Sequence, residues 1–189
     1  HPEVLEAVRQ LPTRPRVVSV TARRFDELFE SVEVLGEAAG RSKEARALNA
    51  QLRREILAIQ HRIRGVRMKP RVWCAEWLDP LMAAGHWIPE LVTRAAGVDG
   101  FGRVGEDSVR VAWEDVRHYD PEVIVVMPCS FSLERTTKES PLLTNLPGWS
   151  SVSAVKAGKV FAVEGSLFHR PGPRLVQGLK LMAALFHPE

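Results

Sequence analysis

The sequence predicts an α/β protein: a three-layer α/β sandwich lobe with a mostly parallel sheet, preceded by a long helix and a β/α unit. Short runs of β-branched and aromatic residues alternate with helical stretches in the second half of the chain, a pattern typical of a parallel sheet covered by helices. A long amphipathic stretch precedes them. We therefore divide the chain into a first unit at 1–41, a long helix at 42–68 and a C-terminal α/β lobe at 69–189.

The first unit is expected to contain a helix, a strand and a second helix. Apolar positions on one face predict a helix over 3–11, which two prolines end. The β-branched run RVVSV predicts a strand over 16–20. Apolar spacing then predicts a helix over 25–40, with Gly40 as its C-terminal stop.

A long helix is expected over 42–63. Its apolar residues recur at spacings of four, four, three and four, which places them in one stripe: Leu48, Leu52, Ile56, Ile59 and Ile63. A helix of about 22 residues is roughly 33 Å long, which is long enough to act as a spacer between two lobes.

The C-terminal lobe is expected to alternate strands with helices. The predicted elements are a strand at 71–77, a helix at 87–97, a helix at 113–120, a strand at 122–127, a strand at 159–164 and a helix at 173–186. In folds of this kind, ligands bind outside the carboxyl ends of the parallel strands.

Composition and charge exclude two classes of protein. The 189 residues suffice for one ordinary domain or two small lobes. No apolar run approaches the roughly 18 to 20 residues of a membrane-spanning helix, so we expect no integral membrane protein. The net charge is only +3, and the basic clusters at 14–24 and 62–71 contain no nucleic-acid-binding motif, so we expect no nucleic-acid partner.

The most distinctive side chains follow the ends of the predicted strands. They are Trp77, Asp79, His86 and Trp87 after the first strand, Pro128, Cys129, Phe131, Glu134 and Arg135 after the second, and Phe168, His169, Arg170 and Arg174 after the third. Three loops from one edge of the sheet would form a single wall. Aromatic platforms with a few convergent polar groups are typical of a ligand-binding site.

The tryptophans have two interpretations, because a large ring can either line a ligand site or anchor the core. Trp73, Trp113 and Trp149 lie in or beside predicted strands and helices, and we interpret them as core anchors. For Trp77 and Trp87 both interpretations stay open.

Thiol catalysis is an alternative to binding. Such an enzyme would use Cys74 or Cys129 as nucleophile and His86, His118 or His169 as base. The spacing of these residues supports no specific enzyme class, and isolated cysteines usually pack as small apolar residues. We therefore expect no enzyme. A bond between the two cysteines would require neighbouring strands, so that question stays open.

A metal site is a second alternative. Four residues of the proposed wall have side chains that can bind a metal ion: His86, His169, Glu90 and Asp79. The sequence contains no HxxxH or HExxH spacing among them, and histidines at loop ends are more often hydrogen-bonded surface groups. We therefore expect neither a protein-bound metal nor a cofactor.

The C-terminal lobe resembles a known family. The strings EWLDPLMAAGHWIPELVTRAAG, SVRVAWEDV, DPEVIVVMPCSFSLERT, LPGWSSVSAVKAGKVFAVEG and FHRPGPRLVQGL are similar, in order and spacing, to the C-terminal half of cobalamin-type (helical-backbone, class III) periplasmic substrate-binding proteins of ABC importers. The resemblance covers essentially 69–189. Residues 1–68 resemble the last β/α unit of the N-terminal lobe and the bridging helix between lobes, so most of a first lobe is expected to be missing from this chain.

The resemblance implies a function. It implies that the protein binds cobalamin or a related corrinoid in a cleft between two lobes and delivers it to a membrane permease. The residues expected to face the ligand are Trp77, Asp79, His86, Trp87, Ser108, Arg110, Phe131, Phe168, His169 and Arg170. Glu90 is expected to dock on the permease. Alternative interpretations are a receptor for an iron-siderophore or haem, or a cytosolic enzyme or interaction domain.

The resemblance implies a location, and the missing first lobe implies an assembly state. A periplasmic or cell-surface location is expected, although the chain shows no signal peptide. The strand at 16–20 and the helix at 25–40 would lack a partner sheet, and unpaired edges and apolar patches promote association. We therefore expect a homodimer.

Overall fold

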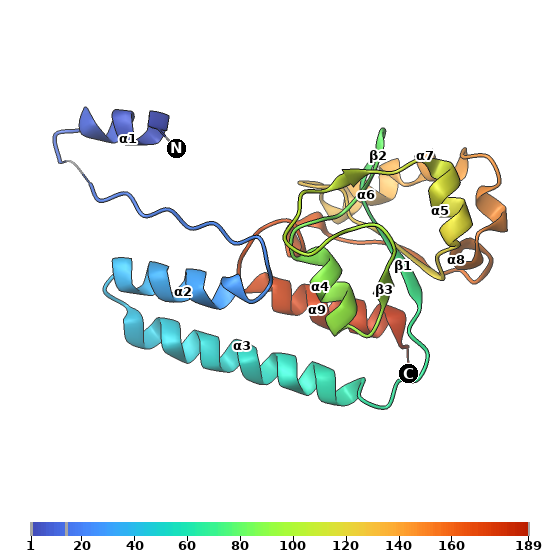
Figure 1. Cartoon of the computed structure of the whole chain (residues 1–189), viewed down its shortest axis with the longest axis horizontal. Coiled ribbons are helices and arrows are strands. Elements are labelled where there is room, and N and C mark those ends of the chain that lie inside the picture. The colour runs from blue at the N-terminus through green and yellow to red at the C-terminus, as the bar shows by residue number, and fades with distance from the viewer. Residues whose placement is uncertain (1, 14, 189) are drawn as a thin grey trace.

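The computed structural model describes residues 2–13 and 15–188. Their elements form an N-terminal arm, a pair of helices and an α/β lobe that the helical pair flanks (Figure 1). The expected order of a first unit, a long helix and a final lobe is therefore present. The division into parts of two lobes stays a prediction.

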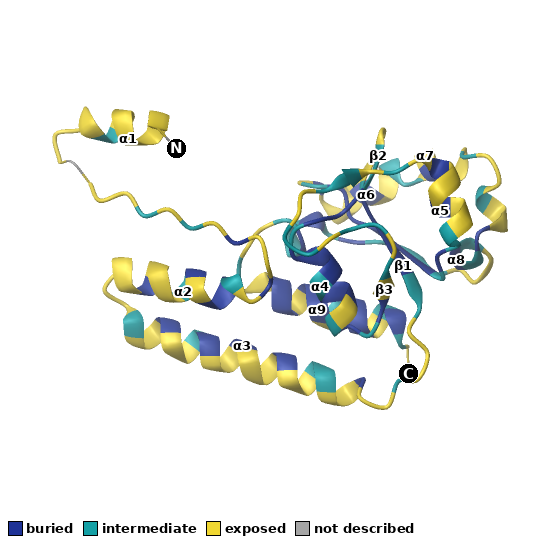
Figure 2. Cartoon of the chain, viewed as in Figure 1, coloured by how far each residue is buried: buried dark blue, intermediate teal, exposed yellow. Residues whose placement is uncertain are grey.

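The N-terminal arm contains a helix but no strand. Helix α1 (Pro2–Arg9) buries none of its residues, and Figure 2 shows it as an exposed element apart from the body. The prediction of a strand over 16–20 was wrong, because these residues form an extended segment outside the sheet. Their β-branched side chains favour extended backbone, but a strand also needs a hydrogen-bonded neighbour.

The expected homodimer stays a prediction, which a molar mass measured by light scattering would test.

Helices α2 (Glu27–Ala38) and α3 (Ser42–Arg62) form a hairpin. The turn between them contains Gly40 with φ +66°, in the left-handed region that glycine adopts without strain, so its expected role as a stop is confirmed. The helices approach closely where Gly36 meets Ala45, since an added Cβ at Gly36 would lie 2.3 Å from the Ala45 Cβ. Only glycine fits at that contact.

The apolar stripe of α3 packs on the lobe. Leu52, Ile56 and Ile63 are buried, while Leu48 and Ile59 are partly buried against the same core. The partner of α3 on this side is α9 (Arg174–Phe186), which lies between the helical pair and the sheet (Figure 1). The predicted stripe is therefore confirmed, and one face of the long helix is fixed to the lobe.

A six-stranded sheet forms the centre of the lobe. Its strands are β1 (Arg71–Leu78), β2 (Leu81–Ala83), β3 (Val98–Asp99), β4 (Val109–Arg110), β5 (Val123–Val126) and β6 (Val160–Ala162). The order is β4-β2-β1-β5-β6, with β3 also paired to β1. The β1–β3, β1–β5 and β5–β6 pairs are parallel, whereas β2 and β4 pair in antiparallel fashion. The mostly parallel sheet is confirmed, although the sequence did not predict β2, β3 and β4.

Helices cover both faces of the sheet. They are α4 (Ile88–Arg94), α5 (Trp113–Tyr119), α6 (Leu133–Glu139), α7 (Pro141–Thr144), α8 (Ser153–Lys156) and α9, with the 3₁₀ turns η1 (Trp149–Ser151) and η2 (Gly165–Leu167). Alternate residues of β1 enter different cores: Cys74 packs with residues of α4 and α9, while Trp73 packs with residues of α5 and α8. The predicted three-layer sandwich is confirmed.

Three tryptophans lie in or against the core beneath α5. Trp73 is fully buried and Trp113 nearly so, and their rings are 6.4 Å apart. The ring of Trp149 is 5.7 Å from that of Trp113 and packs against the same core. Their interpretation as core anchors is confirmed.

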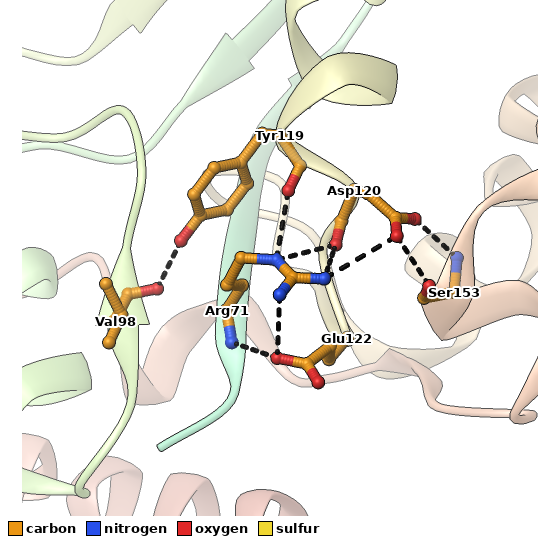
Figure 3. A network of polar contacts seen from close by, with 6 residues as sticks. All are labelled: Arg71, Val98, Tyr119, Asp120, Glu122 and Ser153. Carbon is orange, nitrogen blue, oxygen red and sulfur yellow. Dashed lines mark hydrogen bonds and ion pairs between the residues drawn. The ribbon is translucent and has the colours of Figure 1, made fainter. Parts of the chain in front are cut away.

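The amino end of β1 carries a dense polar network (Figure 3). The Arg71 side chain donates through Nε to the Tyr119 carbonyl at 3.0 Å and through Nη2 to the Asp120 carbonyl at 2.7 Å. It also lies 3.5 Å from a carboxylate oxygen of Asp120 and from one of Glu122. Ser153 donates two hydrogen bonds to the Asp120 carboxylate. We call these five residues the amino-edge network.

Candidate functional site

The loops after β1, β5 and β6 meet at one edge of the sheet. Because these three strands are parallel neighbours, their carboxyl ends lie together. We call this edge, formed by 76–79, 127–131 and 163–170, the carboxyl edge. The predicted convergence of the three loops is confirmed.

A carboxylate, a thiol and an imidazole converge at the carboxyl edge. Single ligand atoms of Glu76, Cys129 and His169 all lie within 4.8 Å of one another. His169 Nδ1 is 3.4 Å from Glu76 Oε1, and the two side chains are only 7% and 16% exposed. We call these three residues the Glu76 cluster.

Neighbouring groups fix the orientation of the Glu76 cluster. His169 Nε2 hydrogen-bonds the Met127 carbonyl, and Ser108 Oγ donates to Glu76 Oε2. The backbone N–H of Cys129 donates to the Glu76 carbonyl at 3.2 Å, which continues the parallel pairing of the two strands beyond β5. One polar atom of each of Glu76 and His169 is therefore occupied, and the other faces into the cluster.

Burial lowers the pKa of His169 below its ordinary value. The Glu76 carboxylate and the Met127 carbonyl act in the opposite direction, and the charge of His86 adds to the lowering. Since burial is the largest cause, the neutral imidazole is favoured at neutral pH. A neutral imidazole with one N–H bound to a carbonyl has a lone pair on its other nitrogen.

A second polar chain links the loop after β2 to the segment that precedes α2. His86, which has φ +53°, places Nε2 3.2 Å from Asp107 Oδ1. Arg23 donates to the same carboxylate oxygen at 2.6 Å and to the Gly105 carbonyl at 2.8 Å. The hydrogen bond from Arg23 is the largest cause of a lowered pKa at Asp107. Arg23 was not among the predicted site residues.

Trp77 provides aromatic surface at the carboxyl edge. Its side chain is 36% exposed, and its ring meets the ring of Phe131 edge to face at 5.5 Å. The Arg135 guanidinium lies 3.6 Å from the centre of the Phe131 ring. Trp77 Nε1 donates to the carbonyl of Asp79, itself an exposed residue. Of the two tryptophans whose interpretation was open, Trp77 is the one at the surface.

Trp87 and Phe168 are core residues, which corrects the expectation that their rings face a ligand. Trp87 is 7% exposed and Phe168 is fully buried. Trp87 Nε1 donates to the Phe168 carbonyl at 2.6 Å, so the indole N–H is satisfied inside the protein. Phe168 packs on α9 at Gly178, where an added Cβ would lie 2.8 Å from its ring. Their apolar area is thus used in folding.

The two predicted arginines occupy different positions. Arg110 is in β4, where it pairs with Met82, the residue that also pairs with Trp77, so Arg110 is level with Trp77 but on the opposite side of β1 from the loops after β5 and β6. Arg170 directly follows His169 at the carboxyl edge. Both residues are exposed and carry charge at the protein surface.

Glu90 holds the N-terminal segment on the lobe. Its side chain is 15% exposed, Oε2 accepts from the Phe25 backbone N–H at 2.9 Å, and Oε1 accepts from Arg94 at 2.9 Å. Arg94 also binds Asp26 at 2.9 Å. Both carboxylate oxygens therefore have partners inside the chain, and the expected docking of Glu90 on a permease stays a prediction.

Neither cysteine is arranged for nucleophilic catalysis. Both are free, and burial raises the pKa of Cys74 well above its ordinary value, so this thiol stays protonated. Cys129 lies near His169, whose ring nitrogens face Met127 and Glu76. His118 contacts its own helix through the Glu114 carbonyl. Across residues 2–13 and 15–188, no imidazole hydrogen-bonds a thiol.

The sequence-based search missed Glu76 as a site residue. Glu76 falls inside the predicted strand at 71–77, and residues inside a strand were interpreted as core. The signal was a lone carboxylate in the otherwise apolar run VWCAEW, since an acid there needs a specific partner. Of the four residues that the sequence offered as metal ligands, His169 alone is in the Glu76 cluster. His86, Glu90 and Asp79 are not.

Most of this chain is similar to known proteins. The family model described as periplasmic binding protein matches residues 6–167. A curated relative, the uncharacterized ABC transporter substrate-binding lipoprotein YvrC of Bacillus subtilis (strain 168), is 25% identical over 197 residues, which covers 97% of this chain. The chain spans 58% of the length of that relative.

Solved structures share the fold. The periplasmic heme-binding protein RhuT from Roseiflexus sp. RS-1 superimposes with a TM-score of 0.81 at 21% identity, covering 98% of this chain and 71% of that one. The periplasmic vitamin B12 binding protein BtuF of Vibrio cholerae gives a TM-score of 0.74 at 18% identity, covering 98% of this chain and 69% of that one.

Within the described residues, no helix has the length and apolar character needed to cross a membrane.

Proposed function

This chain belongs to the periplasmic binding protein family, and on that premise we propose that it is the substrate-binding component of an ABC importer. Its ligand is cobalamin or a related corrinoid, and it hands that ligand to a membrane permease. The protein acts by binding and release, outside the cytoplasm, at the cell surface or in the periplasm. The name of the curated relative, a substrate-binding lipoprotein, supports this location and role.

One observation carries the proposal: the carboxyl edge presents an exposed indole beside polar groups that are held in place. Trp77 is braced by Phe131 and by its hydrogen bond to the Asp79 carbonyl, so its ring is fixed before a ligand arrives. A fixed aromatic surface loses little entropy on binding a large planar ligand. Residues 69–189 would form this wall of the cleft, 42–68 the bridging helix and 1–41 part of the facing lobe.

The ligand class is supported by the known ligands of proteins with this fold. The names of two such proteins refer to vitamin B12 and to heme, both flat metal chelates. The indole of Trp77 suits either of them. We place the corrinoid first because the sequence resemblance is to the cobalamin type.

An anionic chelate, such as haem or an iron-siderophore, is the second candidate. The observation that favours it is the positive charge around the aromatic surface. The Arg135 guanidinium lies over the Phe131 ring and donates through Nε to Glu139, and Arg170 is exposed at the same edge. Guanidinium groups bind carboxylates through paired hydrogen bonds. Haemin and a ferric hydroxamate are therefore the comparison ligands for every titration.

Calorimetric titration with cyanocobalamin tests the proposal. We expect saturable binding, and we expect Trp77→Ala to weaken it by roughly 1–3 kcal/mol, the range typical of a buried aromatic contact. Trp87→Ala is unsuitable, because Trp87 is in the core and its loss would destabilise the fold. The matched control is Leu57→Ala, an exposed apolar residue on α3 that is 64% exposed.

The outcomes separate the candidates. Equal losses in Trp77→Ala and Leu57→Ala would contradict a ligand site at the carboxyl edge. Binding of haemin or a ferric hydroxamate without binding of cyanocobalamin would replace the corrinoid by the second candidate. No binding of any of the three by this chain or by a longer chain containing it would contradict the proposed function.

A further inference from the structure

We propose that Glu76, Cys129 and His169 form a binding site for a divalent cation of the zinc class. The inference concerns the bare ion and does not depend on the proposed chelate, since it rests on three side chains of one lobe. The three residues lie at the carboxyl ends of β1 and β5 and after η2. Carboxylate, thiolate and imidazole are the ligand types that zinc prefers in proteins.

The distances suit a tetrahedral ion. Ligands at about 2.0–2.3 Å from zinc in tetrahedral geometry lie roughly 3.3–3.8 Å from one another. His169 Nδ1 and Glu76 Oε1 are already 3.4 Å apart. The Cys129 sulfur is within 4.8 Å of both ligand atoms, and rotation about its single side-chain torsion moves it without backbone change.

Two of the three ligands already have the supporting contacts that metal ligands need. A metal-binding histidine usually gives its other ring N–H to a carbonyl or carboxylate, which fixes the ring and its tautomer. His169 Nε2 has that contact with the Met127 carbonyl, so Nδ1 is the ligand atom. Ser108 Oγ likewise occupies Glu76 Oε2 and leaves Oε1 for the ion.

The centre of the cluster favours a positive charge. His169 Nδ1 and Glu76 Oε1 face each other at 3.4 Å in side chains that are only 7% and 16% exposed. Such a pair repels unless a proton or a metal ion lies between the atoms. A proton would give an imidazolium–carboxylate pair, and an ion would also recruit the adjacent thiol of Cys129.

A site with three protein ligands leaves one tetrahedral position open. Closed four-ligand zinc sites are structural, whereas open sites exchange water or a substrate atom. Cys129 is partly exposed, so the site can be reached from solvent. We infer an exchangeable site, suited to capture and release of the ion or to joining it to a donor atom of a bound ligand.

Metal titration of the whole 189-residue chain, freed of metal with a chelator, tests the site. We expect one Zn²⁺ per chain by calorimetry, and with Co²⁺ a thiolate-to-cobalt absorption band in the near ultraviolet. Cys129→Ser removes the band and lowers Zn²⁺ affinity at least tenfold, and His169→Gln lowers the affinity similarly. Ser108→Ala weakens binding by roughly tenfold, as loss of a supporting contact does. The matched control is His118→Gln, whose exposed imidazole lies on α5.

Urea unfolding of each variant shows that the fold is kept. Loss of Zn²⁺ binding in the cluster variants, with His118→Gln unchanged, supports the site. Absence of Zn²⁺ binding by the unmodified chain overturns it, and so does unchanged affinity in Cys129→Ser and His169→Gln, which would show an adventitious ion only. Because cyanocobalamin is titrated separately, failure of the metal site is distinguishable from failure of the proposed function.

Discussion

The two ends of β1 show how the same strand supports opposite arrangements of charge. At the amino edge, Arg71 meets two carboxylates and two backbone carbonyls (Figure 3). At the carboxyl edge, Glu76 meets an imidazole whose burial favours the neutral form, and a thiol. In the first arrangement the charged groups have hydrogen-bonding and opposite-charge partners within the chain. In the second, an imidazole nitrogen and a carboxylate oxygen face each other at 3.4 Å with the thiol beside them.

This difference indicates what each edge does. Groups whose hydrogen bonds and charges are complete contribute to stability and offer a ligand little. Groups held in place with free lone pairs cost some stability and are ready to bind. We therefore expect substitutions at the amino edge to change the free energy of unfolding, and substitutions at the carboxyl edge to change binding.

The largest effect on stability is expected at Arg71. Arg71→Met removes the side-chain hydrogen bonds to the Tyr119 and Asp120 carbonyls and leaves Asp120 and Glu122 without their cation. We expect a loss of about 2–3 kcal/mol in the free energy of unfolding, as for hydrogen bonds to charged groups. Urea unfolding measures it. A loss below about 0.5 kcal/mol would remove the contrast between the two edges.

A smaller effect, dependent on pH, is expected at Asp120. Hydrogen bonds from Ser153 lower the pKa of Asp120, so its stabilising contribution is present above the unfolded value of about 3.9 and is lost as pH falls through the lower folded value. Asp120→Asn should cost at most about 1 kcal/mol at neutral pH, because the amide is a weaker acceptor than the carboxylate and solvent screens a side chain that is 41% exposed.

The check is a series of urea unfolding curves from neutral pH to below the folded pKa of Asp120. The difference between the unmodified chain and Asp120→Asn should shrink as the solution becomes more acidic. A difference that stays constant across this range would contradict the role given to the carboxylate. Thr137→Ala, an exposed substitution on α6, serves as the control.

The smallest effect on stability is expected in the Glu76 cluster. Glu76→Gln keeps the shape of the side chain and an acceptor for Ser108, and Cys129→Ser replaces a partly exposed thiol by a hydroxyl, so the free energy of unfolding should stay within about 0.5 kcal/mol. Unfolding is measured with a chelator present. A loss above about 2 kcal/mol would show that the cluster is structural, like the amino edge.

Much of the fold could be predicted because it follows from local patterns. The apolar stripe of α3 and the buried run of β5 are repeated features that determine helix and strand directly. The short strands β2 and β4 contain two or three residues, and they exist because β2 pairs with β1 and β4 pairs with β2, so no local pattern marks them. Residues 16–20 show the reverse case. Their β-branched side chains favour a strand, but the segment lies outside the sheet.

The site was predicted less well, because burial depends on tertiary packing. The sequence places Trp77, Trp87 and Phe168 equally after strand ends, yet Trp77 is at the surface and the other two are in the core. Glu76 was missed because strand position alone suggested core. Sequence order predicted which loops meet, but the direction of each side chain depends on the turn that precedes it.

Hydrogen exchange with and without cyanocobalamin tests the central claim, that the carboxyl edge is the binding side of this lobe. We predict slower amide exchange at 127–131 and 165–170 in the presence of the corrinoid, with no change at 119–123 in the amino-edge network. Protection at 119–123, or saturable binding without protection at the carboxyl edge, would contradict the account.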